Sequence, residues 1–138
     1  MTERLDMAGA LLREKGLHLS QPRLQLLGML LKHKGHHTAD DLYALLSARA
    51  PGISRTTVYN ILNALCAAGI VRMLPLNGKS MWYELNGTAH AHFLCDGCGR
   101  VTDMGGIPHL QSDSRLANCL IRQYDVIYRG LCPACSGA

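Results

Sequence analysis

The sequence lacks the features that would place the chain in a membrane or outside the cell. It contains no run of eighteen apolar residues, so no segment is long enough to span a bilayer as a helix. Its first residues, MTERLDMAGALLREKG, carry acidic groups within a helical pattern instead of a basic segment followed by an apolar core. Internal repeats and low-complexity stretches are absent too. We therefore expect a soluble, cytoplasmic protein that does not bind a membrane.

The chain also has little net charge, and its basic excess lies in the first part. With 138 residues and 48% hydrophobic content it should fold, as one ordinary domain or two very small ones. Residues 1–85 hold 10 basic and 6 acidic side chains, whereas residues 86–138 hold 4 of each. This asymmetry suits a polyanion-binding module joined to a neutral module, although a net charge of +4 is common in proteins that never contact DNA.

The first 85 residues predict four helices and a two-stranded hairpin. Apolar residues recur at helical spacing, and three of the helices begin after residue types that cap helix N-termini, Ser20, Thr38 and Ser54. Residues 70–76 and 81–85 predict strands joined by an Asn-Gly turn, a strong hairpin signal. Helices followed by such a hairpin indicate a winged helix-turn-helix.

From residue 86 the pattern changes to short strands around cysteines. Residues 90–104 predict two strands joined by a cysteine turn, and residues 125–132 predict a strand that runs into the last cysteine pair. Residues 109–124 are compatible with a helix. We therefore predict an α+β protein: a winged helix-turn-helix domain over residues 1–85 and a small α/β domain over residues 86–138.

Two cysteine pairs, Cys95-x2-Cys98 and Cys132-x2-Cys135, have the spacing of a structural zinc site. A two-residue gap lets both sulfurs of a tight turn point at one ion, and two such turns supply the four corners of a tetrahedron. Independent redox pairs are the alternative, but a thioredoxin-like motif would need a strand-helix-strand unit that the pattern does not show. Four protein ligands leave no open position, so the zinc should be structural.

The other two cysteines, Cys66 and Cys119, have no cysteine neighbour at ligand spacing. Free cysteine usually behaves as a small apolar residue, so we expect both to be buried on apolar helical faces.

A second cluster of metal-binding residue types begins with His90 and His92. Residues two apart on a strand project from the same face, so both imidazoles can reach one ion. The spacing does not complete the site, and the candidate partners are Glu84, Asp103, His36, His37 and His109. Exposed histidines on a loop are the alternative interpretation.

Five segments together resemble the ferric uptake regulator (Fur) family of bacterial metal-dependent repressors. In order they are HHTADDLY, SRTTVYNILNAL, MWYEL, HAHFLCDGCGRVTD and GLCPAC, and the match covers about residues 5–135. In that family a winged-helix DNA-binding domain precedes a small dimerisation domain with a four-cysteine zinc, and a regulatory ion lies between the two domains. The resemblance therefore implies a homodimer that represses transcription at a double-stranded DNA operator and is not an enzyme.

The resemblance also implies the ligands of the regulatory ion. By position they are His36, Glu84, His90, His92 and Asp103, with His37 as an alternative to His36. Such a mixed nitrogen and oxygen set suits Fe²⁺, Mn²⁺ or Zn²⁺ without choosing among them. An ion that needs ligands from both domains is fully coordinated in one relative orientation only, so it would select the DNA-competent dimer.

The helix expected after Ser54 offers a polar face to DNA. A recognition helix places its N-terminal residues nearest the bases, and the tyrosine of TVY is a recurring DNA contact in the family. The candidate DNA-binding residues are Arg23, Arg55, Thr57, Tyr59 and Asn60, with Lys79 and Arg72 of the hairpin as further phosphate contacts. By composition alone the same face could simply be solvated.

Among the branches of the family, the peroxide-sensing PerR branch is nearest in motif. The HxH spacing, Asp103 and TADD carry this resemblance, and in that branch bound iron generates an oxidant that modifies a ligand histidine. The branch often has aspartate where this chain has Glu84, so control of iron or zinc uptake stays open. Many relatives carry a third metal site, but residues 111–129 contain no histidine or glutamate, so we expect none here.

Two other functions fit parts of the sequence. Zinc-dependent nucleotide deaminases also combine a histidine with a cysteine pair, but they need His-x-Glu where this chain has His-Ala-His. A zinc-ribbon interaction module without a regulatory ion is the other, and it predicts that His90→Ala leaves the response of DNA binding to metal unchanged.

Overall fold

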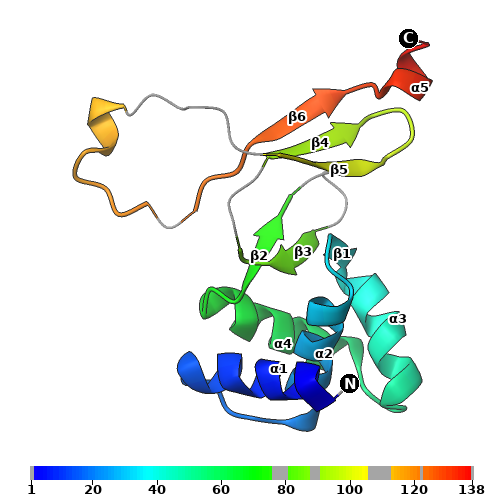
Figure 1. The fold of residues 1–138 in the computed structure, drawn as a ribbon, viewed down its shortest axis with the longest axis vertical. Helices are drawn as coiled ribbons and strands as arrows, with labels where there is room; N and C mark the ends of the chain where they lie inside the picture. The colour runs from blue at the N-terminus through cyan, green and yellow to red at the C-terminus, as the bar shows by residue number, and fades with distance from the viewer. Residues whose placement is uncertain (1, 76–80, 88–90, 106–112, 122, 138) are drawn as a thin grey trace. The chain divides into compact units, whose positions relative to one another are not determined.

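The computed structural model describes residues 2–75, 81–87, 91–105, 113–121 and 123–137. The chain separates into two compact units, Met1–Asn86 and Gly87–Ala138, and each is described by itself (Figure 1). None of the helices in the described segments combines the length and the apolar character that a membrane span requires.

Four helices form most of the first unit: α1 (Thr2–Glu14), α2 (Gln21–Lys32), α3 (Ala39–Arg49) and α4 (Arg55–Ala67). The three predicted caps are confirmed, because the hydroxyls of Ser20, Thr38 and Ser54 each accept a hydrogen bond from a backbone N–H three residues later. At Thr38 the carboxylate of Asp41 also accepts from the cap's own backbone N–H, which completes a capping box.

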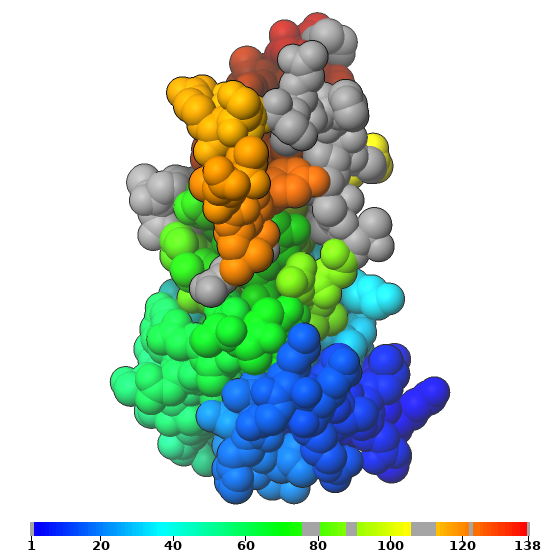
Figure 2. Space-filling model, turned by 90° about the vertical axis from the view of Figure 1, so that its left-hand side faces the viewer, coloured from blue at the N-terminus to red at the C-terminus, as the bar shows by residue number. Residues whose placement is uncertain are grey.

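Leucines from all four helices fill the core of the first unit. Leu12 of α1, Leu27 of α2, Leu46 of α3 and Leu62 of α4 are completely buried. α1 packs against α2, and the blue of the first helices borders the green of α4 in Figure 2. Each fully buried leucine contributes about 1.5–3 kcal/mol to the stability of the fold. Since α3 and α4 share this core, it holds them together as a helix-turn-helix.

A three-stranded sheet completes the first unit. Strands β1 (His37–Thr38), β2 (Val71–Leu74) and β3 (Trp82–Leu85) are antiparallel in the order β1-β3-β2. The paired β2 and β3 confirm the winged helix-turn-helix, whereas β1 was not predicted because two residues carry no periodicity. The expected Asn-Gly turn lies outside the described residues.

The second unit contains another three-stranded sheet. Strand β4 (Ala91–Cys95) pairs antiparallel with β5 (Val101–Met104) and parallel with β6 (Ile127–Gly130). Short helical turns follow at η1 (Ser114–Leu116) and α5 (Pro133–Ser136). The two strands around a cysteine turn and the strand before the last cysteine pair are thus confirmed.

The helix considered for residues 109–124 is not formed at the described positions 113–121, 123 and 124, apart from the single turn η1. Asp113 accepts hydrogen bonds from the backbone N–H and the guanidinium of Arg115, and such local bonds compete with helix formation. Leu116, Leu120 and Ile121 are exposed, so burial of an apolar face does not compensate.

Candidate functional site

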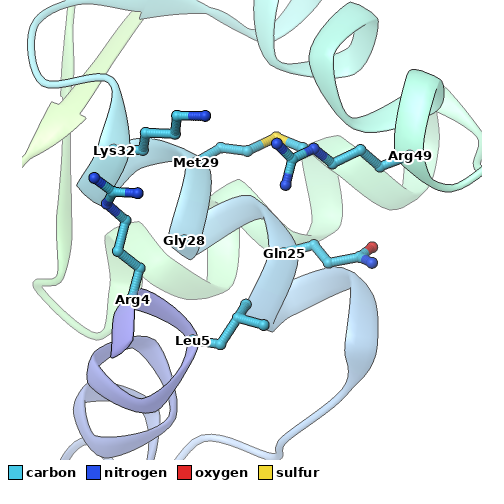
Figure 3. A pocket seen from close by; sticks show the side chains of 7 residues that line it. All are labelled: Arg4, Leu5, Gln25, Gly28, Met29, Lys32 and Arg49. Atoms are coloured by element: carbon cyan, nitrogen blue, oxygen red, sulfur yellow. The ribbon is translucent and has the colours of Figure 1, made fainter. Parts of the chain in front are cut away.

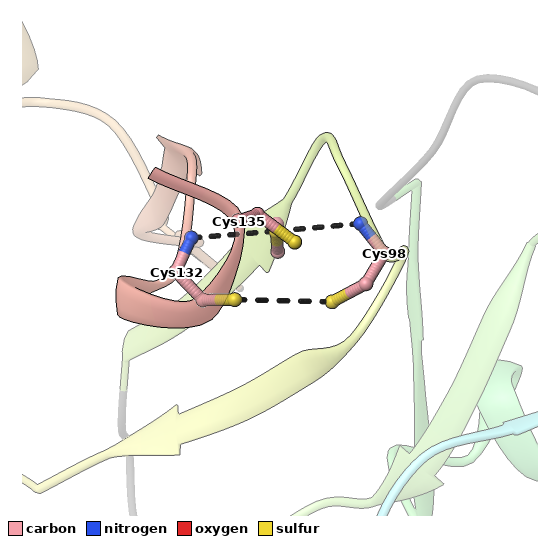
Figure 4. Close-up of side chains that lie close together, drawn as sticks. Cys98, Cys132 and Cys135 are labelled. Atoms are coloured by element: carbon pink, nitrogen blue, oxygen red, sulfur yellow. Dashed lines mark hydrogen bonds between the residues drawn. The ribbon is translucent and has the colours of Figure 1, made fainter. Parts of the chain in front are cut away.

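The four paired cysteines converge at one end of the second sheet. Cys95 ends β4, Cys98 lies in the turn that follows, Cys132 caps α5 and Cys135 lies within α5. Their four sulfurs all lie within 4.8 Å of one another. The Sγ atoms of Cys98 and Cys132 are 4.0 Å apart (Figure 4), close to the ~3.8 Å edge of a tetrahedron with metal–sulfur bonds of about 2.3 Å. The cluster therefore fits a zinc ion.

Backbone pairing and glycine allow this convergence. Cys95 pairs with Gly130 across the parallel strands, which brings the chain segment before Cys132 alongside the first cysteine turn. A Cβ at Gly97 would lie 3.0 Å from both Cβ and Sγ of Cys135, so a side chain there would press on the fourth ligand. Gly99 has a φ of 75°, a conformation that other residues adopt only with strain.

Two thiols of the cluster differ in acidity before any metal binds. The backbone N–H of Cys132, 3.3 Å from Cys95 Sγ, and that of Cys98, at 3.5 Å, lower the pKa of Cys95 to about 6. Hydrogen bonding to Cys132 and then to the other cysteine sulfurs raises the pKa of Cys135 to about 12. One sulfur is thus ready as a thiolate, the form that binds metal, while its neighbour retains its proton.

The two remaining cysteines differ from each other. Cys66, on α4, is half-buried against the helical core, and burial raises the pKa of its thiol, as expected for an inert cysteine. The expectation for Cys119 is wrong: it is exposed and lies outside any helix, because the surrounding segment forms only the turn η1.

The first unit brings together one nitrogen and one oxygen ligand. His36 precedes β1 and Glu84 lies on β3, with His36 Nε2 3.2 Å from Glu84 Oε2. His37 faces elsewhere, since its Nε2 lies 2.6 Å from the carbonyl oxygen of His33. Of the two adjacent histidines, His36 is therefore the one beside the glutamate. An imidazole and a carboxylate at this separation suit a divalent cation such as Fe²⁺, Mn²⁺ or Zn²⁺.

The expectation that Arg72 contacts a DNA phosphate is wrong. Arg72 lies on β2, in the pair of strands β2 and β3 that forms the wing. It lies directly opposite Glu84 in the β2–β3 ladder, and its Nε is 3.9 Å from Glu84 Oε1. The side chain is almost completely buried, so the guanidinium faces a carboxylate and not solvent. Lys79, the other wing cation, lies outside the described residues.

The second unit also brings together one histidine and one carboxylate. His92 on β4 and Asp103 on β5 are register partners, and His92 Nε2 lies 3.6 Å from Asp103 Oδ1. The carboxylate of Asp103 is exposed, whereas His92 is buried. His90 and His109 lie outside the described residues.

The outer face of α4 carries most of the candidate DNA contacts. Arg55, Thr56, Tyr59, Asn60 and Asn63 are exposed along it, while Val58, Ile61, Leu62 and Leu65 of the same helix are buried. Tyr59 is 45% exposed despite its aromatic ring. An exposed polar and aromatic face on the second helix of a helix-turn-helix suits the major groove.

Three of the predicted DNA-binding residues have intramolecular partners. Arg23 donates from Nη1 to the carbonyl of His18 at 2.9 Å, which ties α2 to the preceding loop. Thr57 is half-buried, and its hydroxyl bonds to that of Ser54 at 2.9 Å in the helix cap. Arg55 pairs with Asp40 and lies over the ring of Tyr43, 4.4 Å from its centroid. These contacts orient the side chains at the start of α2 and α4.

A separate hollow in the first unit has a volume of about 270 Å³ and lies between α1, α2 and the end of α3. Exposed cations, Arg4, Lys32 and Arg49, surround its apolar floor of Leu5 and Met29 (Figure 3). It contains none of the metal-binding residue types.

Comparison with known proteins agrees with this geometry. The model of the ferric uptake regulator family matches residues 14–118. The chain belongs to this family. It is 34% identical over 130 residues to the transcriptional regulator FurA of Mycobacterium tuberculosis, covering 91% of this chain and 87% of FurA. It is 32% identical over 136 residues to the peroxide-responsive repressor PerR of Staphylococcus aureus, covering 95% and 90%.

The fold agrees with that of solved members of the Fur family. A structure of the ferric uptake regulator of Francisella tularensis with iron superimposes with a TM-score of 0.68 at 27% identity, covering 88% of this chain and 96% of that one. The family resemblance predicted from the sequence is confirmed, and the chain is a metal-dependent transcriptional regulator and not an enzyme.

Proposed function

We propose that the chain is a cytoplasmic, homodimeric repressor whose binding to a DNA operator requires a regulatory Fe²⁺ or Mn²⁺ ion. The ligands of this ion are His36, Glu84, His90, His92 and Asp103, and a zinc ion on Cys95, Cys98, Cys132 and Cys135 stabilises the second unit.

One observation carries this proposal: each unit holds one histidine beside one carboxylate, which together can offer a nitrogen and an oxygen ligand. His36 and Glu84 approach to 3.2 Å within the first unit, and His92 and Asp103 to 3.6 Å within the second. Two ligands are too few to hold an ion tightly, whereas one ion that takes both pairs has at least four. Such an ion is complete only in one arrangement of the units, so its binding energy selects that arrangement.

DNA binding is proposed for the first unit. The exposed face of α4 presents Tyr59 and Asn60, which suit base and phosphate contacts in the major groove. The basic excess of residues 1–85 adds attraction to the phosphate backbone. Repression follows if the occupied operator overlaps a promoter, and the PerR relative is named a repressor.

Metal analysis tests the two-site arrangement first. Protein purified without oxygen should contain one zinc per chain that survives a mild chelator wash and a second ion that the wash removes. Iron or manganese as the second ion supports the proposal, while zinc would support a repressor of zinc uptake. If no second ion can be loaded, a zinc module without regulatory metal is the better interpretation.

A variant tests the coupling between metal and DNA. Asp103→Asn removes an exposed ligand carboxylate without changing the shape of the side chain, and Asp96→Asn removes the same charge from the exposed turn nearby. Duplexes selected by the manganese-loaded protein from a random pool serve as the DNA probe. Asp103→Asn should lose the increase in DNA affinity on addition of Mn²⁺, and Asp96→Asn should keep it. Equal responses would contradict the regulatory role.

Peroxide sensing is a second candidate function, favoured by the PerR relative at 32% identity. Iron supplies the oxidising chemistry when it is bound, and this chain supplies the histidines that would be modified. Hydrogen peroxide should then add oxygen to a ligand histidine in the iron-loaded protein, and not in the manganese-loaded one, as read by peptide mass spectrometry. Unmodified histidines with retained DNA binding would leave metal uptake control as the function.

A further inference from the structure

Arg72 is a buried cation beside one of the proposed metal ligands. It stands on β2 opposite Glu84 on β3, and the two side chains are 8% and 4% exposed. Because side chains alternate along a strand, both project from the sheet face opposite the one that carries Val71 and Tyr83 into the helical core. The two charged groups therefore lie on the same face and, at 3.9 Å, well within the Debye length of about 8 Å, so salt screens their interaction little.

The two oxygens of Glu84 face different partners. Oε2 lies 3.2 Å from His36 Nε2, whereas Oε1 lies 3.9 Å from Arg72 Nε. A cation held by His36 and Glu84 would therefore be bound close to a guanidinium on the far side of the same carboxylate. The positive charge of the guanidinium repels such a cation, and this repulsion is strongest where water is excluded.

We propose that Arg72 is the counter-ion of Glu84 in the metal-free protein and that it lowers the affinity of the regulatory site for divalent cations. This inference rests on the proposed function. Without metal, Arg72 offsets the charge of a buried carboxylate that would otherwise be costly. With metal bound, the same guanidinium opposes the two positive charges of the ion.

Arg72 would thereby set the ion concentration at which the regulator responds, without ligating the ion itself. The β2–β3 register fixes the position of Arg72, because a shift of one residue would turn its side chain to the other face of the sheet.

Affinity measurements on the full, zinc-loaded chain test this proposal. Mn²⁺ is titrated against a fluorescent chelator for the wild type, Arg72→Gln, Arg72→Lys and Arg4→Gln. Arg72→Gln keeps a hydrogen-bond donor but loses the charge, so it should bind Mn²⁺ about tenfold more tightly. Arg72→Lys keeps the charge and should stay within about threefold of the wild type. Arg4→Gln removes an exposed charge from the same unit and should change nothing.

Thermal unfolding provides a second measurement. Arg72→Gln should lower the unfolding midpoint of the manganese-free protein and enlarge the upward shift that Mn²⁺ produces. If Arg72→Gln binds Mn²⁺ as the wild type does or more weakly, or if Arg72→Lys binds as tightly as Arg72→Gln, the inference is wrong. If neither the wild type nor Arg72→Gln binds a second ion, the proposed function fails as well.

Discussion

At the scale of single residues, Gly97 has the closest approach to an added methyl group among the glycines that the structure describes. A Cβ there would lie 3.0 Å from Cys135 Sγ and 3.3 Å from Leu131 Cδ2, so the added carbon would push the fourth ligand out of place. We predict that Gly97→Ala loses zinc to a chelator about tenfold faster than the wild type. Gly105→Ala is the matched control, because nothing lies within 4 Å of its added Cβ. Equal rates for both variants would contradict this reading of the close approach.

The acidity of Cys95 gives a prediction about pH. Its pKa is lowered from 9.0 to about 6, so the thiolate is present above about pH 6 and is lost as the pH falls through that value. Ultraviolet thiolate absorbance of zinc-free, reduced protein should therefore show a titration near pH 6. Cys95→Ser should abolish this step, and Cys119→Ser should leave it in place. A first titration close to pH 9 in the wild type would show that the two backbone N–H groups do not act as described.

At the scale of elements, the contact between α3 and α4 restrains a candidate DNA-binding side chain. Arg55 at the start of α4 pairs with Asp40 of α3, and both are exposed. Asp40→Asn should release Arg55 for phosphate, raise DNA affinity severalfold and steepen the salt dependence by about one unit. Asp6→Asn changes the net charge equally from α1 and should have a smaller effect. The same gain in both variants would mean that net charge alone matters.

The elements that the sequence predicted are those whose signals are local. Ser20, Thr38 and Ser54 cap helices through bonds to residues three positions away, and the cysteine turn requires only neighbouring residues. The pairing of Arg72 with Glu84 could not be predicted in this way, because it depends on the register in which two separate strands pair. The segment around Leu116 and Leu120 has apolar residues at helical spacing, but a helix also needs a surface on which to pack.

At the scale of the whole molecule, the exposed apolar side chains of the second unit bear on the proposed homodimer. Leu116, Leu120, Tyr124, Tyr128 and Leu131 are all exposed in the single chain, and Leu120 is 81% exposed. So many large exposed apolar side chains in one small unit suit an interaction surface. A second copy of the chain is the occupant that the proposed function requires.

A charge placed at Leu120 tests this assembly. Leu120→Glu should weaken dimerisation about a hundredfold, because an unpaired carboxylate buried in an apolar interface is costly. Met7→Glu, at an exposed apolar position of α1, should leave the dimer intact. Sedimentation of the zinc-loaded proteins over a range of concentrations measures both. Since Leu120 is 81% exposed and is not one of the proposed metal ligands, Leu120→Glu should retain its zinc and still bind Mn²⁺. A monomer with both ions but weak affinity for DNA would show that metal acts on the operator only through the dimer. A dimer in Leu120→Glu would move the interface to another face of the chain.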